Sequence, residues 1–282
     1  MSNYLRRIIF LLFVILSGLN LFALEKVLKI HFINVGEGDS IFIEFPDKKN
    51  ALIDTGNLKT GVDVYNYLKQ LKVKKINHLI LTHPHPDHIG GVFTVAQLLE
   101  VDNFYDNGDS IEKVKSKEDL YRWYDDFFRK NIRYKELSVG DLLEFDGAKL
   151  EVLWPDKWVS EEWNANSLVI MLSYGSFKCL LMADGNNETE SFLMKKDINL
   201  QADILKAGHH GAEDTADADF VNIIKPQAVI ISVNENNVRG YPSPDVIKNY
   251  EAIDAMIYYI YSYKSIVLSV KKDGAFRLIE RR

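Results

Sequence analysis

Three histidines and an aspartate lie within six residues, in the segment 83–88 (His-Pro-His-Pro-Asp-His). The segment follows the short apolar run 78–82, which predicts a β-strand, and it precedes Gly90-Gly91. Imidazole is the commonest metal ligand in proteins, and a solvated polar loop seldom gathers so many ligand-type side chains. We interpret the segment as a metal-binding loop at the end of a strand.

The spacing within this loop divides the ligands between two ions. Residues two apart project to the same side of an extended segment, so His83 and His85 can hold one ion. Asp87 and His88 project elsewhere, where they can hold a second ion. The two prolines of the loop fix φ and stiffen it, and Gly90-Gly91 is expected to let the backbone turn sharply into a helix over 91–99.

A second histidine pair, His209 and His210, follows another apolar strand in the segment 206–211 (Lys-Ala-Gly-His-His-Gly). Two neighbouring side chains cannot both point at the same ion without strain, so we expect one to bind metal and the other to face the substrate. Asp184 stands between the two clusters, at the end of a strand, and its two carboxylate oxygens can bridge two cations. Lys206 either assists the reaction or is an ordinary strand-end charge.

Residues 1–23 differ in kind from the rest of the chain. Arg6 and Arg7 precede the apolar run 8–16, and the small residue Ala23 follows, a pattern typical of a secretory signal peptide. The run is shorter than the ~20 residues that span a membrane. The sequence therefore predicts cleavage after Ala23, export to the periplasm or the exterior, and no transmembrane domain after removal of the leader. An uncleaved N-terminal anchor is the alternative.

The charge of the chain disfavours extensive binding of nucleic acid. Lys and Arg number 34 against 40 acidic residues, a net charge of −6, which becomes −8 when Arg6 and Arg7 are removed. This charge repels a polyanion, so stable wrapping by nucleic acid is not expected, whereas a metal site supplies its own positive charge. Cys179 is the only cysteine, which excludes an internal disulfide, and its apolar flanks predict a buried, inert thiol.

Strand and helix patterns follow one another along residues 24–282 without a dividing linker, which predicts one domain. Helical spacing over 62–71 predicts a helix with a capping box formed by Thr60 and Asp63. Residues 51–56 and 180–185 are each an apolar strand that ends in aspartate and glycine, so each half is expected to be a sheet with helices outside. The aromatic segment 109–135, with Ser116 and Asp119 suited to begin a helix, is interpreted as a packed amphipathic helix in preference to a substrate-facing wall.

Residues 82–91 resemble the signature of the metallo-β-lactamase superfamily. More narrowly, the chain resembles the extracytoplasmic hydrolase domain of ComEC-type competence proteins and their stand-alone relatives over residues 28–270. The segments that carry this resemblance are 34–40, 52–56, 82–91, 140–141, 166–169, 183–185 and 205–211. It implies an α/β fold, a four-layer αββα sandwich with the site at strand edges between two sheets.

The same resemblance assigns roles by motif position, with two divalent ions, Zn²⁺ or Mn²⁺. It implies the ligands His83 and His85 for the first ion, Asp87, His88 and His210 for the second, and Asp184 as the bridge. Asp54 would orient a ligand histidine from outside the ligand set, and His209 would contact the substrate.

Two departures from the family pattern affect the expected site. No third histidine is available for the first ion, and the matching stretch is 164–167, in which Asn166 is expected to support the site from outside the ligand set, as Asp54 does. This predicts a weaker first site that water or substrate completes. Tyr241 replaces the histidine of a Gly-His-Pro motif and is expected to act as a donor.

The resemblance and the ligand set together favour an exported hydrolase in which a metal-bridged hydroxide attacks a phosphodiester. Its substrate would be DNA or an envelope component, with Asp87, His209 and Tyr241 as catalytic residues, since two cations suit the charge of a phosphoryl group. Hydrolysis of a carboxylic ester, lactone or thioester is the alternative reaction. A non-catalytic metal-binding module is the alternative from another class. The sequence does not determine the substrate, the native metal or the oligomeric state.

Overall fold

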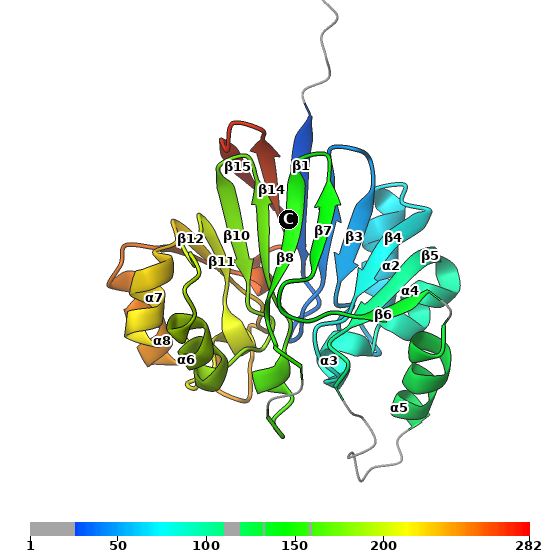
Figure 1. Cartoon of the computed structure of the whole chain (residues 1–282), viewed down its shortest axis with the longest axis horizontal. Coiled ribbons are helices and arrows are strands. Elements are labelled where there is room, and N and C mark those ends of the chain that lie inside the picture. Colours follow the sequence, from blue (N-terminus) through cyan, green and yellow to red (C-terminus); the bar gives the residue numbers. More distant parts are fainter. Residues whose placement is uncertain (1–25, 110–118, 132, 158–159) are drawn as a thin grey trace, which may run out of the picture.

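The computed structural model describes residues 26–109, 119–131, 133–157 and 160–282. Two β-sheets pack face to face, and helices cover the outer face of each sheet (Figure 1). This arrangement confirms the predicted four-layer α/β sandwich. The predicted signal peptide, residues 1–23, and Ser116 lie outside the described ranges.

The first sheet has eight strands in the order β15-β14-β1-β2-β3-β4-β5-β6. Their bounds are β1 (Val27–Ile33), β2 (Ile41–Glu44), β3 (Asn50–Ile53), β4 (Lys75–Ile80), β5 (Glu100–Asp106), β6 (Tyr134–Glu136), β14 (Ser265–Lys271) and β15 (Phe276–Arg281). The second sheet has seven strands in the order β13-β12-β11-β10-β9-β8-β7. Their bounds are β7 (Leu142–Phe145), β8 (Ala148–Trp154), β9 (Val169–Tyr174), β10 (Phe177–Leu181), β11 (Ile204–Lys206), β12 (Ala228–Ile231) and β13 (Met256–Tyr259).

The helices fall into two groups, one on each outer face (Figure 1). The first sheet carries α2 (Gly61–Gln70), α4 (Val92–Leu98), α5 (Asp119–Trp123) and its π-helical continuation (Tyr124–Arg129), with the short α3 (Pro86–Ile89) at the sheet edge. The second sheet carries α6 (Asn187–Lys195), α7 (Ala218–Ile224) and α8 (Pro244–Glu251). No helix in these described ranges combines the length and apolar character needed to cross a membrane.

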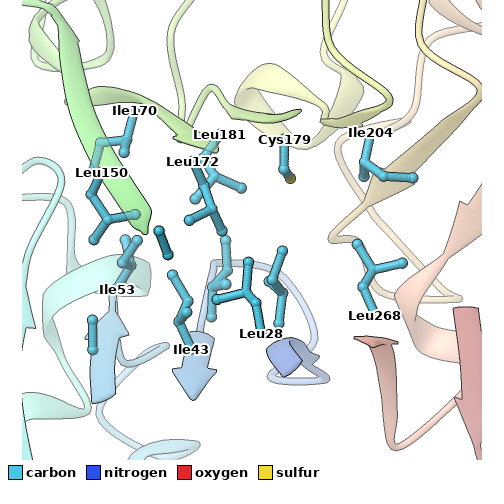
Figure 2. Close-up of a cluster of buried hydrophobic side chains, with 14 of the residues drawn as sticks. Leu28, Ile43, Ile53, Leu150, Ile170, Leu172, Cys179, Leu181, Ile204 and Leu268 are labelled. Carbon is cyan, nitrogen blue, oxygen red and sulfur yellow. The ribbon is translucent and has the colours of Figure 1, made fainter. Parts of the chain in front are cut away.

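The core between the sheets is made by alternating strand residues. Leu28, Ile43 and Ile53 of the first sheet face Leu150 and Leu172 of the second, among other aliphatic side chains (Figure 2). All five are at most 3% exposed, and burying each contributes about 1.5–3 kcal/mol. Such packing fixes how the strand ends of one sheet lie against those of the other.

Cys179 belongs to this core, where burial raises the pKa of its thiol far above the usual range. The predicted buried thiol is confirmed. The aromatic residues of the helical segment also pack inward: Tyr121, Tyr124 and Phe128 are buried against α4 and β5. This confirms a packed helix for the part of segment 109–135 that is described.

The predicted capping box at the start of α2 is wrong. Thr60 already has helical backbone angles and its side chain caps no helical N–H. Instead Asn57 accepts the backbone N–H groups of Lys59 and Thr60 through its side-chain oxygen, and the Thr60 hydroxyl accepts the N–H of Asn57. The chain therefore turns at Asn57, three residues before the Thr60 that the pattern predicted as the cap.

Candidate metal centre

The potential ligands come from strand ends that meet at one edge of the sandwich. Asp54 follows β3, and residues 83–88 follow β4, which pairs parallel to β3. In the second sheet Asp184 follows β10, and the pair His209-His210 follows β11, again parallel strands. Since parallel strands end at the same edge, these segments are brought together although up to 156 residues separate them.

One group of ligand-type side chains has four members, whose offered atoms all lie within 4.8 Å of one another: Asp87, His88, Asp184 and His210. Asp184 Oδ1 lies 3.2 Å from Nε2 of His88 and 3.4 Å from Nε2 of His210. Nε2 of His210 lies 3.6 Å from Oδ2 of Asp87. We call this set the four-ligand group.

The histidines of the four-ligand group present lone pairs to its centre. Nδ1 of His88 donates to Asp54 Oδ2 at 2.7 Å, and Nδ1 of His210 donates to the Ser232 carbonyl at 2.9 Å. Each neutral ring has then used its only N–H, which leaves Nε2 as an acceptor. Both Nε2 atoms and Asp184 Oδ1 are buried and lack a hydrogen-bond partner within the described ranges. Facing acceptors without a proton between them are unfavourable, so the geometry fits a cation.

The electrostatics of this group also favour added positive charge. Burial acts to lower the pKa of His210, but the carboxylates of Asp184 and Asp87 outweigh it and raise that pKa to about 9. Burial also acts to lower the pKa of His88, but the carboxylates of Asp184 and Asp54 outweigh it and raise that pKa well above its usual range. A divalent ion would supply the same compensation without protonating the ligands.

A second group has three members, His83, His85 and Asp184. Nε2 of His83 lies 3.0 Å from Nδ1 of His85 and 3.7 Å from Asp184 Oδ2. The Thr82 hydroxyl donates to Asp54 and so accepts from Nδ1 of His83 at 3.1 Å, which again leaves Nε2 unprotonated. Burial, and then His88, hold the pKa of His83 well below its usual range. Asp184 is therefore common to both groups, one oxygen facing each.

Asp54 lies outside both ligand sets and connects them. Its Oδ1 accepts the backbone N–H of Thr82 at 2.8 Å, and its Oδ2 accepts both the Thr82 hydroxyl and His88 Nδ1 at 2.7 Å. One buried carboxylate thus fixes the start of segment 83–88 and the orientation of the His88 ring, an arrangement typical of residues that support metal ligands.

His209 belongs to neither group. Its Nδ1 lies 2.9 Å from Asp214 Oδ1, its Nε2 lies 3.1 Å from Asn164 Nδ2, and its ring centre is 5.5 Å from that of Tyr241. Both His209 and His210 have positive φ, 38° and 55°. These consecutive left-handed residues send the two adjacent rings in different directions. His209, but not His210, lines a hollow of about 420 Å³ that Tyr241 also lines.

Asn166, expected to support the site from outside the ligand set, contacts two residues that belong to neither group. Its side-chain amide donates to Asp109 Oδ2 at 3.0 Å and to the Ser160 carbonyl at 2.7 Å. Residues 164–166 form one turn of 3₁₀-helix, in which residues two apart face different sides. Asn164 is consequently the amide that contacts His209.

Several site residues carried too weak a signal in the sequence. Lys206 is fully buried and pairs with Asp39 Oδ2 at 2.5 Å, while also donating to the Ala183 carbonyl at 3.2 Å. It is therefore neither an exposed strand-end charge nor a group facing substrate. Trp163 packs its ring 5.2 Å from that of His85. An isolated tryptophan and an aspartate in a glycine-rich turn have many other uses, so spacing alone did not reveal them.

The role expected for Gly90-Gly91 is corrected. Their φ values are −60° and −70°, which any residue adopts. A Cβ on Gly91 would come within 2.0 Å of the Thr55 carbonyl oxygen. The glycine is required by close backbone packing, not by a sharp turn.

Gly38 is constrained both by its backbone conformation and by close packing. Its φ is +105°, and a Cβ at this position would lie 2.1 Å from the Asp87 carbonyl oxygen. We expect Gly38→Ala to displace the metal-binding loop, lower the metal content and reduce stability by more than the ~1–2 kcal/mol of a left-handed alanine. Metal analysis and urea denaturation measure both effects. Gly140→Ala is the matched control, since Gly140 has φ +90° and nothing within 4 Å of the added Cβ. Equal losses for the two variants would refute the contact.

Comparison with curated proteins finds similarity to three that are named for competence or recombination. ComE operon protein 3 of Bacillus subtilis is 27% identical over 237 residues, 78% of this chain and 30% of that protein. Recombination protein 2 of Haemophilus influenzae is 24% identical over 87% of this chain and 28% of its own length. Competence protein ComA of Neisseria gonorrhoeae is 23% identical over 76% of this chain and 28% of its own length. The chain spans less than a third of the length of these relatives.

Solved structures share the fold. CmlA, a diiron beta-hydroxylase from Streptomyces venezuelae, superposes with a TM-score of 0.55 at 11% identity over 91% of this chain and 54% of that one. YhfI from Bacillus subtilis, a metallo-beta-lactamase fold protein, has a TM-score of 0.50 at 13% identity over 89% of this chain and 99% of that one. The family profile of the metallo-beta-lactamase superfamily matches residues 33–233. The chain therefore belongs to the metallo-beta-lactamase superfamily.

Proposed function

We propose that the protein is an exported hydrolase that uses two divalent ions to cleave a phosphodiester. The observation that carries this proposal is the convergence of buried lone pairs without hydrogen-bond partners: Nε2 of His88, Nε2 of His210 and Oδ1 of Asp184. The second group, His83 and His85, adjoins the other oxygen of Asp184. Two adjacent ligand groups with a shared carboxylate support a dinuclear centre.

The ligand sets support ions of unequal affinity. The four-ligand group would hold the tighter ion, and the three-ligand group would hold the looser one. Bound Zn²⁺ or Mn²⁺ would act as Lewis acids toward a phosphoryl group and activate water. Asp54 and the Ser232 carbonyl would keep His88 and His210 in the tautomer that binds metal.

His209 is suited to hold a substrate oxygen beside the ions. Asp214 accepts from its Nδ1, which fixes the orientation of the ring. Its Nε2 lies 3.1 Å from Asn164 Nδ2, and Tyr241, which lines the same hollow as His209, offers a hydroxyl donor. Burial raises the pKa of Tyr241, so its hydroxyl keeps its proton.

We expect His210→Ala and His209→Ala to separate metal binding from substrate contact. His210→Ala removes a ligand of the four-ligand group, so metal content and turnover should fall together. His209→Ala should keep both ions and lower turnover on a phosphodiester by a factor of ~100 or more, because it removes a contact to developing charge. Metal stoichiometry beside turnover measures the difference. Loss of metal in His209→Ala alone would reverse the assignment.

The choice of substrate class needs a direct screen. The relatives' names make DNA the first polymer to test, with a small phosphodiester such as bis-(p-nitrophenyl) phosphate beside a carboxylic ester, a lactone and a thioester. Phosphodiester cleavage that disappears after chelation and returns with Zn²⁺ or Mn²⁺ is the expected result. Hydrolysis of the ester set alone would replace the proposed reaction, and no hydrolysis by the metal-loaded protein would favour a binding module.

Export is tested by the position of the N-terminus. We expect the protein recovered outside the cytoplasm to begin near Leu24, with residues 1–23 removed. N-terminal sequencing of each cell fraction measures this. A membrane-bound form that still contains Met1 would instead support the anchor.

A further inference from the structure

The end of the sandwich opposite the metal centre is rich in lysine. A groove of about 840 Å³ there is formed by the start of β1, the β2–β3 turn and the α2–β4 connection. Its lining includes seven lysines, Lys26, Lys29, Lys48, Lys49, Lys72, Lys74 and Lys75, which we call the lysine-rich end. Only two acidic residues, Glu44 and Asp47, share the lining. The local charge is thus +5 on a chain whose net charge is −6.

The strand directions separate this end from the metal centre. β1, β3 and β4 all begin at the lysine-rich end, and β2 ends there, as the pairing of these strands requires. The metal-binding residues follow the other ends of β3 and β4, next to α3 (Figure 1). The six residues of β4 place about 20 Å between the two. A phosphodiester bound among the lysines would therefore not lie in the metal centre.

Part of the positive charge is left for a partner. Four of the lysines form ion pairs: Lys26 with Asp146, Lys29 with Glu44, Lys49 with Asp47, and Lys75 with Asp102. Lys48, Lys72 and Lys74 are exposed and form no ion pair within the described part of the chain. These three ammonium groups project from two adjacent connections and can meet one anionic surface together.

The lining lacks the features that favour single-stranded nucleic acid. Proteins that bind such strands stack bases on exposed aromatic rings. The two aromatic residues of this groove, Phe42 and Phe45, are 1% and 3% exposed and offer no such platform. The charges are also all lysine, which acts as a point charge and not as a reader of base edges.

The position of the chain's apolar segment favours a lipid partner. The first strand begins at Val27, beside Lys26 in the lysine-rich end. The apolar run 8–16, with Arg6 and Arg7 before it, lies ten residues earlier in the sequence, and ten residues reach at most about 36 Å. Until the proposed cleavage after Ala23, a leader inserted in the membrane would keep this end nearest the bilayer, and the new N-terminus near Leu24 would still lie beside Lys26.

We propose that the lysine-rich end docks on an anionic lipid bilayer, through Lys48, Lys72 and Lys74 together. The strand ends that carry the metal centre then face away from the lipid, open to solutes. Each lysine near an anionic surface contributes about 1 kcal/mol, a factor of about 5 in partition coefficient, so three contribute a factor of about 100.

Sedimentation with lipid vesicles tests this proposal on the full chain. Phosphatidylcholine vesicles are compared with vesicles that contain about 30% phosphatidylglycerol, and the ratio of the two partition coefficients removes the contribution of the apolar leader. The variant carries Lys48→Gln, Lys72→Gln and Lys74→Gln. The control carries Lys157→Gln, Lys195→Gln and Lys225→Gln, three exposed lysines elsewhere, with the same loss of charge. Each triple has two residues at positive φ, so backbone strain is matched.

We expect the anionic-to-neutral ratio to fall at least tenfold in the first triple variant and by less than about threefold in the control. Equal ratios in the two variants would overturn the proposal. The proposal would also be overturned if the first triple variant kept its anionic-to-neutral ratio but selectively lost binding to a labelled DNA duplex. That result would assign this end to nucleic acid. Hydrolysis of a soluble phosphodiester should be the same in both variants, so a failure here is distinct from a failure of the proposed function.

Discussion

Replacing Asp184 by asparagine should remove both ions from the protein, whereas loss of any one histidine should weaken one of them. Asp184 is the residue common to the two ligand groups, with Oδ1 near His88 and His210 and Oδ2 near His83. An amide presents one neutral oxygen and one donor, so it cannot hold two cations. We expect metal content to fall from two ions to fewer than one, and turnover to fall by a factor of about 10²–10³.

Asp214→Asn is the matched control for this substitution. Asp214 is an acidic residue near the site, but it contacts His209 and belongs to neither ligand group. Elemental analysis after dialysis should therefore still find two ions in Asp214→Asn. If Asp184→Asn retained both ions, Asp184 would not be shared between them.

The second large effect concerns stability. Lys206→Met should destabilise the metal-free protein by about 3–5 kcal/mol, because it leaves the buried carboxylate of Asp39 without its cation. Asp54 adds to this effect, because its carboxylate offers an oxygen within 4.8 Å of an oxygen of Asp39 and the two buried carboxylates repel each other. Urea denaturation in the presence of a chelator measures the change without a contribution from bound metal.

A second substitution separates the ion pair from general packing. In Lys206→Met/Asp39→Asn the uncompensated charge is gone, so most of the lost stability should return. Lys195→Met, at an exposed position of α6, should change stability by no more than about 0.5 kcal/mol. A loss below about 1 kcal/mol in Lys206→Met would contradict a structural role for the pair.

The local chemistry of the centre was the part most readily predicted from sequence. Ligand-type residues are rare and close together in segment 83–88, and both strand-end aspartates follow apolar runs. These local patterns predicted the two-sheet architecture and the separation of His83 and His85 from Asp87 and His88. Residues that are close in these segments stay close in the structure, because each segment is short and directly follows a strand.

Long-range pairings were not predictable in the same way. Strand β14 returns to pair with β1 in the first sheet, and β15 pairs with β14, although both strands follow the second sheet in sequence. The ion pair of Lys206 with Asp39 joins residues 167 positions apart, and neither sequence neighbourhood indicates the other. The contact of Asn166 with Asp109 was likewise not predictable, since it depends on the one turn of 3₁₀-helix at residues 164–166.

Anomalous diffraction from crystals of the protein grown with Zn²⁺ or Mn²⁺ would locate a pair of metal ions on either side of Asp184. We predict two anomalous peaks, one in contact with His83, His85 and Asp184, and a stronger one in contact with Asp87, His88, His210 and Asp184. A crystal with no peak at Asp184, or with its peaks at other residues, would contradict the account.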